Sequence, residues 1–163
     1  MEIIPYENRH ADGLRNLLMP ILRDEHGYDV HYEDMPDLQD IAGHYRVGIG
    51  ECWVTISKDE VVGVMSILDI GDQQAALRKF FVRKDYRGDK KGTAKHMLQH
   101  LVSYAKKSDL NTIILGTTPA FVSGHRFYEK SGFLRLEPEQ LPVKFPRSQV
   151  HSRFYYLPIE KER

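Results

Sequence analysis

A turn rich in glycine and lysine, residues 86–92, carries the strongest chemical signal in this sequence. It follows a strand-like run, residues 75–83, and precedes a run with helical spacing, residues 93–107. A helix N-terminus offers unpaired backbone N–H groups and a partial positive charge, and glycine lets a phosphate approach the backbone closely. Together these features favour an anion site. Because glycine is common in strand–helix turns, the turn alone does not identify the ligand.

The residues of this turn resemble the acetyl-CoA-binding motif of the GNAT superfamily of N-acetyltransferases, Arg/Gln-x-x-Gly-x-Gly/Ala. In the family an apolar pair follows five and six residues after the first glycine. Counting from Gly92, this spacing reaches Met97 and Leu98, whereas counting from Lys90 it reaches polar residues. We therefore align Gly92 with the first glycine of the motif. The loop is then two residues longer than usual, and the role of Arg87 is left open.

A second segment, Phe127-Tyr128-Glu129-Lys130-Ser131-Gly132-Phe133, resembles the "FYEKxGF" signature of the same family. The two segments have the order and approximate separation that the family shows. The resemblance implies one acetyltransferase domain over residues 1–163, of the α+β (mixed α/β) class. Its central, mostly antiparallel twisted sheet should have about seven strands and about four flanking helices, and it should be splayed at the acetyl-CoA site.

The resemblance also implies which residues bind acetyl-CoA. The backbone near Phe81 and Val82 should pair with the pantetheine arm, and the N–H of Val82 should polarise the thioester carbonyl, as a fixed donor does in a dry site. Backbone N–H groups from Lys91 to Ala94 should face the pyrophosphate, with lysines beside them. The residues implied to bind the cofactor are Phe81, Val82, Arg87, Gly88, Lys90, Lys91, Gly92, Thr93 and Ala94.

The implied reaction is direct transfer, in which a neutral amine attacks the acetyl thioester and coenzyme A leaves as a thiolate. Tyr128 matches the family's general acid. A phenol of pKa about 10 keeps its proton at neutral pH and can donate it, or a hydrogen bond, to a departing thiolate. The alternative for Tyr128 is an aromatic residue packed in the core.

The general base is less clear from the sequence. Many relatives place a glutamate on the strand before the phosphate loop, but residues 75–83 contain no acid. An amine must still give up a proton. The substitutes are Asp69, Glu25, His26 and His151, with a water relay as a further alternative.

Three other sets of residues could carry chemistry. Cys52 lies in a strand-like run beside a tryptophan, which favours a core residue over an acyl-carrying nucleophile. His96 and His100 have a spacing that can hold a metal, but no third ligand is evident, so we expect exposed histidines and no metal. His125 precedes the signature and either lines the cofactor cleft or serves packing.

The charges cancel, with 23 Lys+Arg against 23 Asp+Glu, which argues against a general nucleic-acid binder. They are nevertheless separated. Residues 24–40 hold seven acids and no base, and residues 78–95 hold eight bases and two acids, a net charge of 8 − 2 = +6. Both runs could be solvated faces. The basic run, however, contains the predicted phosphate loop, and the acidic run lies where relatives bind the acceptor, which favours a cationic amine.

Apolar spacing predicts the elements that position these residues. Strands are expected at 2–6, 52–57, 61–70, 75–83, 112–115, 133–136 and 153–157, and helices at 14–22, 37–45, 93–107 and 121–130, with a proline-broken loop at 137–150.

The sequence leaves two functions open. The first is an acetyl-CoA-dependent N-acetyltransferase that acts on a small-molecule or peptide amine. The second is a non-catalytic acyl-CoA-binding module. A third possibility, an unrelated phosphate-binding α/β domain, would not explain the signature segment that contains Tyr128. We expect a cytoplasmic protein without membrane contact. The N-terminus does not resemble a signal peptide, no apolar run is long enough to span a bilayer, and there is only one cysteine. A homodimer is expected from the resemblance alone.

Overall fold

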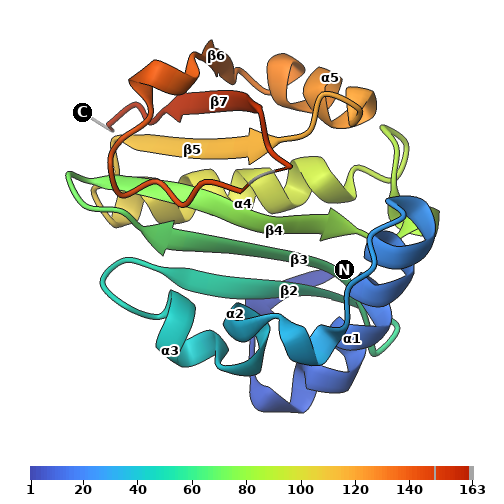
Figure 1. The fold of residues 1–163 in the computed structure, drawn as a ribbon. Coiled ribbons are helices and arrows are strands. Elements are labelled where there is room, and N and C mark those ends of the chain that lie inside the picture. Colours follow the sequence, from blue (N-terminus) through green and yellow to red (C-terminus); the bar gives the residue numbers. More distant parts are fainter. Residues whose placement is uncertain (149, 162–163) are drawn as a thin grey trace. The chain divides into compact units, whose positions relative to one another are not determined.

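The computed structural model describes residues 1–148 and 150–161. The chain divides into two compact units. The first unit comprises Met1–Leu68 and Arg78–His100, and the second comprises Asp69–Leu77 and Leu101–Arg163. The seven strands form one sheet in the order β1-β2-β3-β4-β5-β7-β6 (Figure 1). This sheet and its helices confirm the expected mixed α/β fold.

The observed strands and helices lie close to the ranges that the sequence predicts. The strands are β1 (Glu2–Pro5), β2 (Glu51–Ser57), β3 (Glu60–Asp69), β4 (Gln74–Val82), β5 (Thr112–Thr117), β6 (Leu134–Leu136) and β7 (Arg153–Pro158). The α-helices are α1 (Ala11–Met19), α2 (Pro36–Gln39), α3 (Ile41–Tyr45), α4 (Thr93–Lys107) and α5 (Val122–Lys130). Short segments are the 3-10 helices η1 (Asn8–His10), η3 (Tyr32–Asp34), η4 (Lys84–Tyr86) and η5 (Pro138–Gln140) and the π-helix η2 (Pro20–Glu25).

In the first unit, β1, β2 and β3 form an antiparallel meander. Lys58 and Asp59 join β2 to β3 and have φ of 50° and 63°. Positive φ at both central residues is what a two-residue type I′ hairpin requires. The predicted hairpin is therefore present, with a turn of two residues.

Helices α1 and α4 cover opposite faces of β2 within the first unit. Cys52 and Val54 join the core cluster that contains the leucines of α1, whereas Trp53 between them meets His100 of α4 edge-on, with ring centroids 5.7 Å apart. Successive side chains of a strand point to opposite faces. Because helices cover both faces of the sheet here, β3, which is next to β2, is buried from Val61 to Ile67.

The predicted helix at 37–45 is two helices, α2 and α3, so the fold has five α-helices instead of about four. The break falls at Asp40, whose backbone is non-helical and whose carboxylate accepts the N–H of Gly43 at 3.0 Å. An aspartate that caps a helix end in this way ends one helix and starts the next.

In the second unit, β7 pairs antiparallel with both β5 and β6, and the start of β4 pairs in parallel with β5 through residues 74–76. Helix α5 and strand β6 follow β5 (Figure 1). In the predicted loop 137–150, Phe145 is buried and packs edge-on against Phe154, with ring centroids 6.0 Å apart. Residue 149 of that loop lies outside the described residues.

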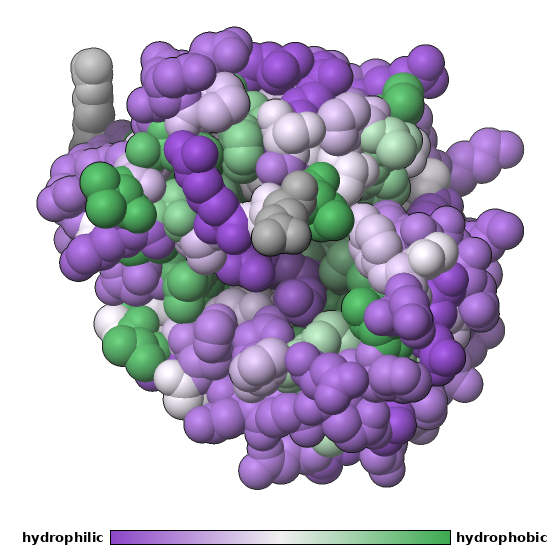
Figure 2. Space-filling model, viewed as in Figure 1, coloured by the Kyte–Doolittle hydropathy of each residue, from purple (hydrophilic) through white to green (hydrophobic). Residues whose placement is uncertain are grey.

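The surface has few large apolar side chains. Hydrophilic residues cover most of the face shown in Figure 2. The exposed large apolar residues are separated along the chain: Met1, Val47, Val122, Leu134, Val143 and Val150. Single exposed apolar residues are normal, so they mark no interface and the expected homodimer stays a prediction. Among the described helices, none has the length and apolarity to cross a bilayer.

Candidate active site

Two glycines shape the turn between β4 and α4. Gly88 and Gly92 have φ of +101° and +66°, which L side chains rarely adopt. The carbonyl of Gly88 accepts the N–H groups of Lys91 at 3.2 Å and of Gly92 at 3.0 Å, and this closes the turn. Helix α4 begins at Thr93, directly after Gly92. The observed start of α4 agrees with the alignment of Gly92 as the first glycine of the motif.

The first turn of α4 presents backbone N–H groups beside this turn. The N–H of His96 donates to the carbonyl of Gly92 at 2.9 Å, so the N–H groups of Thr93 and Ala94 precede the helical ladder. An α-helix leaves such groups without an intrahelical acceptor. Because the N–H groups of Lys91 and Gly92 are used inside the turn, two of the four expected N–H groups remain for an anion.

The lysines and the arginines around the turn differ in whether they form ion pairs. Arg83 pairs with Glu60 and Asp85, and Arg87 pairs with Glu25. Within the described part of the chain, no ion pair forms at Lys84, Lys90, Lys91 or Lys95. The positive charge that is left for an anion therefore belongs to lysines.

Arg87, whose role the motif leaves open, links the end of β4 to η2. Its Nε donates to the carbonyl of Val82 at 2.7 Å, and its two terminal nitrogens donate to the carboxylate of Glu25 at 2.5 and 3.0 Å. Val82 is buried, and Phe81 before it is half-buried against the core cluster that contains α1. Arg87 thus positions Glu25 beside the end of β4, and its contact with a cofactor stays a prediction.

A largely buried charged cluster lies where the backbone of β4 has a positive φ, and the sequence did not reveal it. Lys79 has φ +54° in the middle of the strand, a strained region for a residue with a side chain. Its ammonium lies 3.3 Å from Oδ2 of Asp37, and the hydroxyl of Tyr45 donates to the same oxygen at 2.6 Å. The available signal was the charged pair Arg78 and Lys79 inside an otherwise apolar strand.

In the second unit, the signature segment is a helix C-cap. The N–H of Phe133 donates to the carbonyl of Tyr128 at 3.0 Å, and the N–H of Gly132 donates to that of Glu129 at 3.2 Å. Gly132 has φ +95°. These two bonds and the left-handed glycine define a Schellman motif, in which the residue after the glycine packs back on the helix. The glycine and second phenylalanine of the signature therefore position Tyr128.

Tyr128 lies among aromatic rings. Its ring centroid is 5.6 Å from that of Phe127, 5.4 Å from that of Phe133 and 6.0 Å from that of Tyr155. The residue is 7% exposed. Burial raises the pKa of the Tyr128 phenol above its ordinary value of 10.0, so the phenol stays protonated at neutral pH. This is the protonation state that a general acid needs.

The four sequence candidates for the base divide between the units. Glu25 and His26 lie in the first unit, which also contains Val82, and Asp69 and His151 lie in the second. Asp69 accepts the N–H of Gly71 at 2.9 Å in its own turn. His26 packs on Phe81.

The remaining candidates lie in packed environments or on the surface. Cys52 is buried beside Ser66, and burial raises its pKa to about 11, which confirms the core interpretation. His96 is exposed, but His100 is half-buried against Trp53, so the expected exposure was wrong for His100. His125 is buried, and its Nε2 bonds with the carbonyl of Thr118 at 2.8 Å, which favours a packing role.

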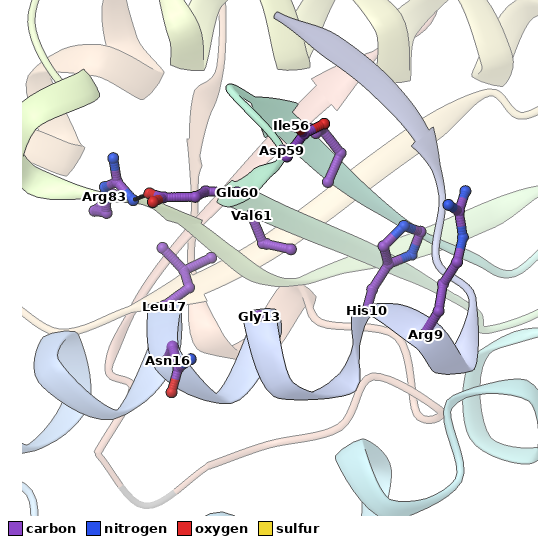
Figure 3. A pocket seen from close by; sticks show the side chains of 10 residues that line it. All are labelled: Arg9, His10, Gly13, Asn16, Leu17, Ile56, Asp59, Glu60, Val61 and Arg83. Atoms are coloured by element: carbon purple, nitrogen blue, oxygen red, sulfur yellow. Dashed lines mark hydrogen bonds and ion pairs between the residues drawn. The ribbon is translucent and has the colours of Figure 1, made fainter.

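Figure 3 shows a pocket of about 420 Å³ between α1 and the β2–β3 hairpin. That volume suits a small ligand. Its two arginines already have partners, because Arg9 pairs with Glu7 and Arg83 with Glu60. The glycines and lysines of the turn 86–92 do not line it, so this pocket is separate from the predicted phosphate site.

The chain is similar to known acetyltransferases in sequence and in fold. The sequence model of the Acetyltransferase (GNAT) family matches residues 13–133. N-acetylaspartate synthetase of Danio rerio is 31% identical over 126 residues, which are 74% of this chain and 44% of that protein, so this chain spans less than half of that relative's length.

Two solved structures support the assignment of the fold. A GNAT-family acetyltransferase from Staphylococcus aureus Mu50 superposes with a TM-score of 0.90 at 29% identity, over 98% of this chain and 99% of that one. The PaiA N-acetyltransferase from Thermoplasma acidophilum, solved in complex with coenzyme A, has a TM-score of 0.72 at 12% identity, over 95% and 96% of the two chains. Since the family model covers most of the sequence and both structures have the same fold, the chain belongs to the GNAT acetyltransferase family.

Proposed function

We propose that this chain is an acetyl-CoA-dependent N-acetyltransferase that moves an acetyl group directly to a primary amine of a small molecule or peptide. The observation that carries the proposal is the turn between β4 and α4, where two left-handed glycines lead into a helix N-terminus. The lysines that flank it form no ion pair with any residue that the structure describes. A helix N-terminus of this kind binds phosphate groups. Its place within the matched family residues supports coenzyme A as the source of that phosphate.

The residues of the first unit fit coenzyme A as a substrate. The N–H groups of Thr93 and Ala94 would hold the pyrophosphate, with Lys90 and Lys91 as its charge partners. The backbone of Phe81 and Val82 would pair with the pantetheine arm, with the Val82 N–H on the thioester carbonyl. PaiA, which shares the fold, was solved with coenzyme A, and this supports the same nucleotide here.

The acceptor was expected to be a cationic amine steered by the acidic residues 24–40. Four of these seven acids already have partners in the chain: Glu25 with Arg87, Glu33 with Arg15, Asp37 with Lys79, and Asp40 with the N–H of Gly43. Asp24, Asp29 and Asp34 form no ion pair among the described residues. The proposal of a cationic acceptor now depends on these three carboxylates.

A second acceptor class has support from the relatives. N-acetylaspartate synthetase is named for the acetylated form of an acidic amino acid. An acidic amine carries the opposite charge, so the two acceptor classes are easy to separate.

The test is release of coenzyme A thiol with acetyl-CoA and a panel that contains a polyamine, a lysine derivative and aspartate. We expect turnover with at least one amine. If cationic amines react and kcat/KM falls as salt is raised from about 0.05 to 0.5 M, steering by exposed acids is supported. Turnover of aspartate alone would exclude the cationic acceptor. Tight binding of coenzyme A without turnover of any amine would favour the non-catalytic module.

A charge-removal variant tests the phosphate site directly. The double variant K90A/K91A is expected to raise the Kd for coenzyme A about 3- to 10-fold, because each exposed lysine–phosphate pair contributes up to about 1 kcal/mol. The measurement is a calorimetric titration at low and high salt, and the difference should shrink at high salt. K106A/K107A, at the other end of α4, removes the same charge and should leave Kd unchanged. Equal effects of the two double variants would contradict the assignment.

A further inference from the structure

The proposed transfer needs a group that takes a proton from the amine, and β4 contains no carboxylate between Gln74 and Val82. Of the four candidates from the sequence, Glu25 and His26 lie in the same unit as Val82. Both residues lie beside the end of β4, Glu25 through Arg87 and His26 through Phe81. This inference rests on the function proposed above.

The segment that carries these two residues is fixed to the end of β4. Arg87 donates one hydrogen bond to the carbonyl of Val82 and two to the carboxylate of Glu25. A planar guanidinium that binds a carboxylate with two parallel bonds fixes its orientation as well as its distance. Glu25 ends the π-helical segment η2, and π-helical turns often occur at functional sites.

His26 follows Glu25 and is placed on β4 by its ring. The imidazole meets the ring of Phe81 edge-on, at an interplanar angle of 89° and with ring centroids 6.2 Å apart. The ring centroid of Tyr28 lies 5.6 Å from that of His26. Phe81 precedes Val82, whose N–H we assign to the thioester carbonyl. His26 therefore packs against the residue next to the proposed reaction centre.

Two acids near β4, Glu25 and Asp37, are poor proton acceptors. The hydrogen bonds from Arg87 hold the pKa of Glu25 below its ordinary value, despite some opposing burial. Burial acts to raise the pKa of Asp37, but the Lys79 charge and the hydrogen bond from Tyr45 hold it below its ordinary value. Both carboxylates already accept strong hydrogen bonds from the chain.

We propose that His26 is the general base of the transfer, and that Glu25 and Arg87 are positioning residues that hold it beside the end of β4. In this step the amine nitrogen forms a bond to the acetyl carbon, and the carbonyl electrons move to oxygen. One N–H proton passes to an imidazole nitrogen of His26. The carbonyl then reforms as the C–S bond breaks, and coenzyme A leaves as a thiolate.

The charges that face His26 set its protonation. Burial lowers its pKa below 6.5, the carboxylate of Glu25 raises it, and the guanidinium of Arg87 lowers it. The ring of Tyr28 lies beside the imidazole. The imidazole is consequently neutral at pH 7 and able to accept a proton, and kcat should fall as the pH drops through the lowered pKa.

The experiment measures kcat by thiol release at saturating acetyl-CoA and amine between pH 5 and 8. His26→Gln should lower kcat at pH 7 about tenfold or more, as loss of a positioned base does, and should remove the acidic limb. The matched control is His31→Gln, which replaces an exposed histidine of the same segment. This variant should keep the wild-type kcat at pH 7 and the acidic limb. Thermal unfolding and coenzyme A binding show whether each variant is folded.

A second variant decides the question even if His26→Gln does not fold. Glu25→Gln removes the charge that raises the pKa of His26, so the acidic limb should move to lower pH. An unmoved limb in Glu25→Gln, or a folded His26→Gln enzyme with wild-type kcat and limb, overturns the assignment of His26. Absence of turnover by the wild-type chain with every amine refutes the proposed function instead, so the two failures are distinct.

Discussion

Replacing Tyr128 with phenylalanine is expected to lower kcat at least tenfold, since a positioned general acid contributes about 10² to 10⁴ to a rate. The substitution removes one hydroxyl and keeps the ring. The contacts of that ring with Phe127 and Phe133, and the cap formed at Gly132, therefore remain. Folding and coenzyme A affinity should change little, and the loss should appear in kcat. Single-turnover thiol release and a calorimetric Kd are the two measurements.

Tyr155 offers a matched control for this variant. It is a fully buried tyrosine in the same unit, and its hydroxyl accepts from Arg153 at 2.8 Å and donates to Glu129 at 3.2 Å. Tyr155→Phe should lower stability by about 1 kcal/mol, because it leaves those partners without a hydrogen bond, and should leave kcat unchanged. If Tyr128→Phe keeps wild-type kcat, Tyr128 serves packing and the acid must be sought elsewhere.

The pH dependence of the Tyr128 role also has a definite sign. Burial raises the phenol pKa above 10.0, so the acid keeps its proton over the whole range in which the enzyme is assayed. Tyr128 therefore contributes no alkaline limb to kcat below about pH 10. A limb near pH 8 that disappears in Tyr128→Phe would contradict this environment.

The sequence predicts those parts of the site that depend on local backbone geometry. Gly92 and the apolar spacing after it place the start of α4, because a left-handed glycine and a helical stripe are both local signals. Likewise, Gly132 ends α5 and its cap positions Tyr128. These predictions needed no knowledge of distant segments.

The contacts that the sequence could not predict join segments far apart in the chain. Arg87 and Glu25 are 62 residues apart, and neither residue type reveals its partner. Lys79, which has a positive φ that no glycine marks, pairs with Asp37 from another element. The charge runs were visible in the sequence, but the two ion pairs that join them, Glu25 with Arg87 and Asp37 with Lys79, are determined only by the fold.

Removing the carboxylate of Asp37 is expected to be the most destabilising single change in the charged segments, at about 3 kcal/mol in the free energy of unfolding. The side chains of Lys79 and Asp37 are 18% and 11% exposed, and Tyr45 is fully buried. Asp37→Ala would leave a half-buried ammonium without a counter-charge and a buried hydroxyl without its acceptor, and both are costly. Urea unfolding measures the loss.

The matched control for Asp37→Ala is Glu33→Ala, which breaks the exposed ion pair with Arg15 in the same acidic segment. Because exposed pairs contribute little, its unfolding midpoint should stay close to that of the wild type. Equal midpoints for the two variants would show that the cluster at β4 is not a structural requirement.

The contribution of Asp37 should also depend on pH. Its pKa in the folded chain lies below the ordinary value of 3.8, so its charged form stabilises the fold above that pH, and this stability is lost as the pH falls through the lowered pKa. Asp37→Asn keeps an acceptor for Tyr45 but has no charge. The difference in unfolding free energy between wild type and Asp37→Asn should therefore be constant above about pH 5 and shrink below about pH 4. A difference that does not change with pH would mean that Asp37 acts through its hydrogen bond with Tyr45 and not through the charge of Lys79, and the strained backbone of Lys79 would then need another stabilising contact.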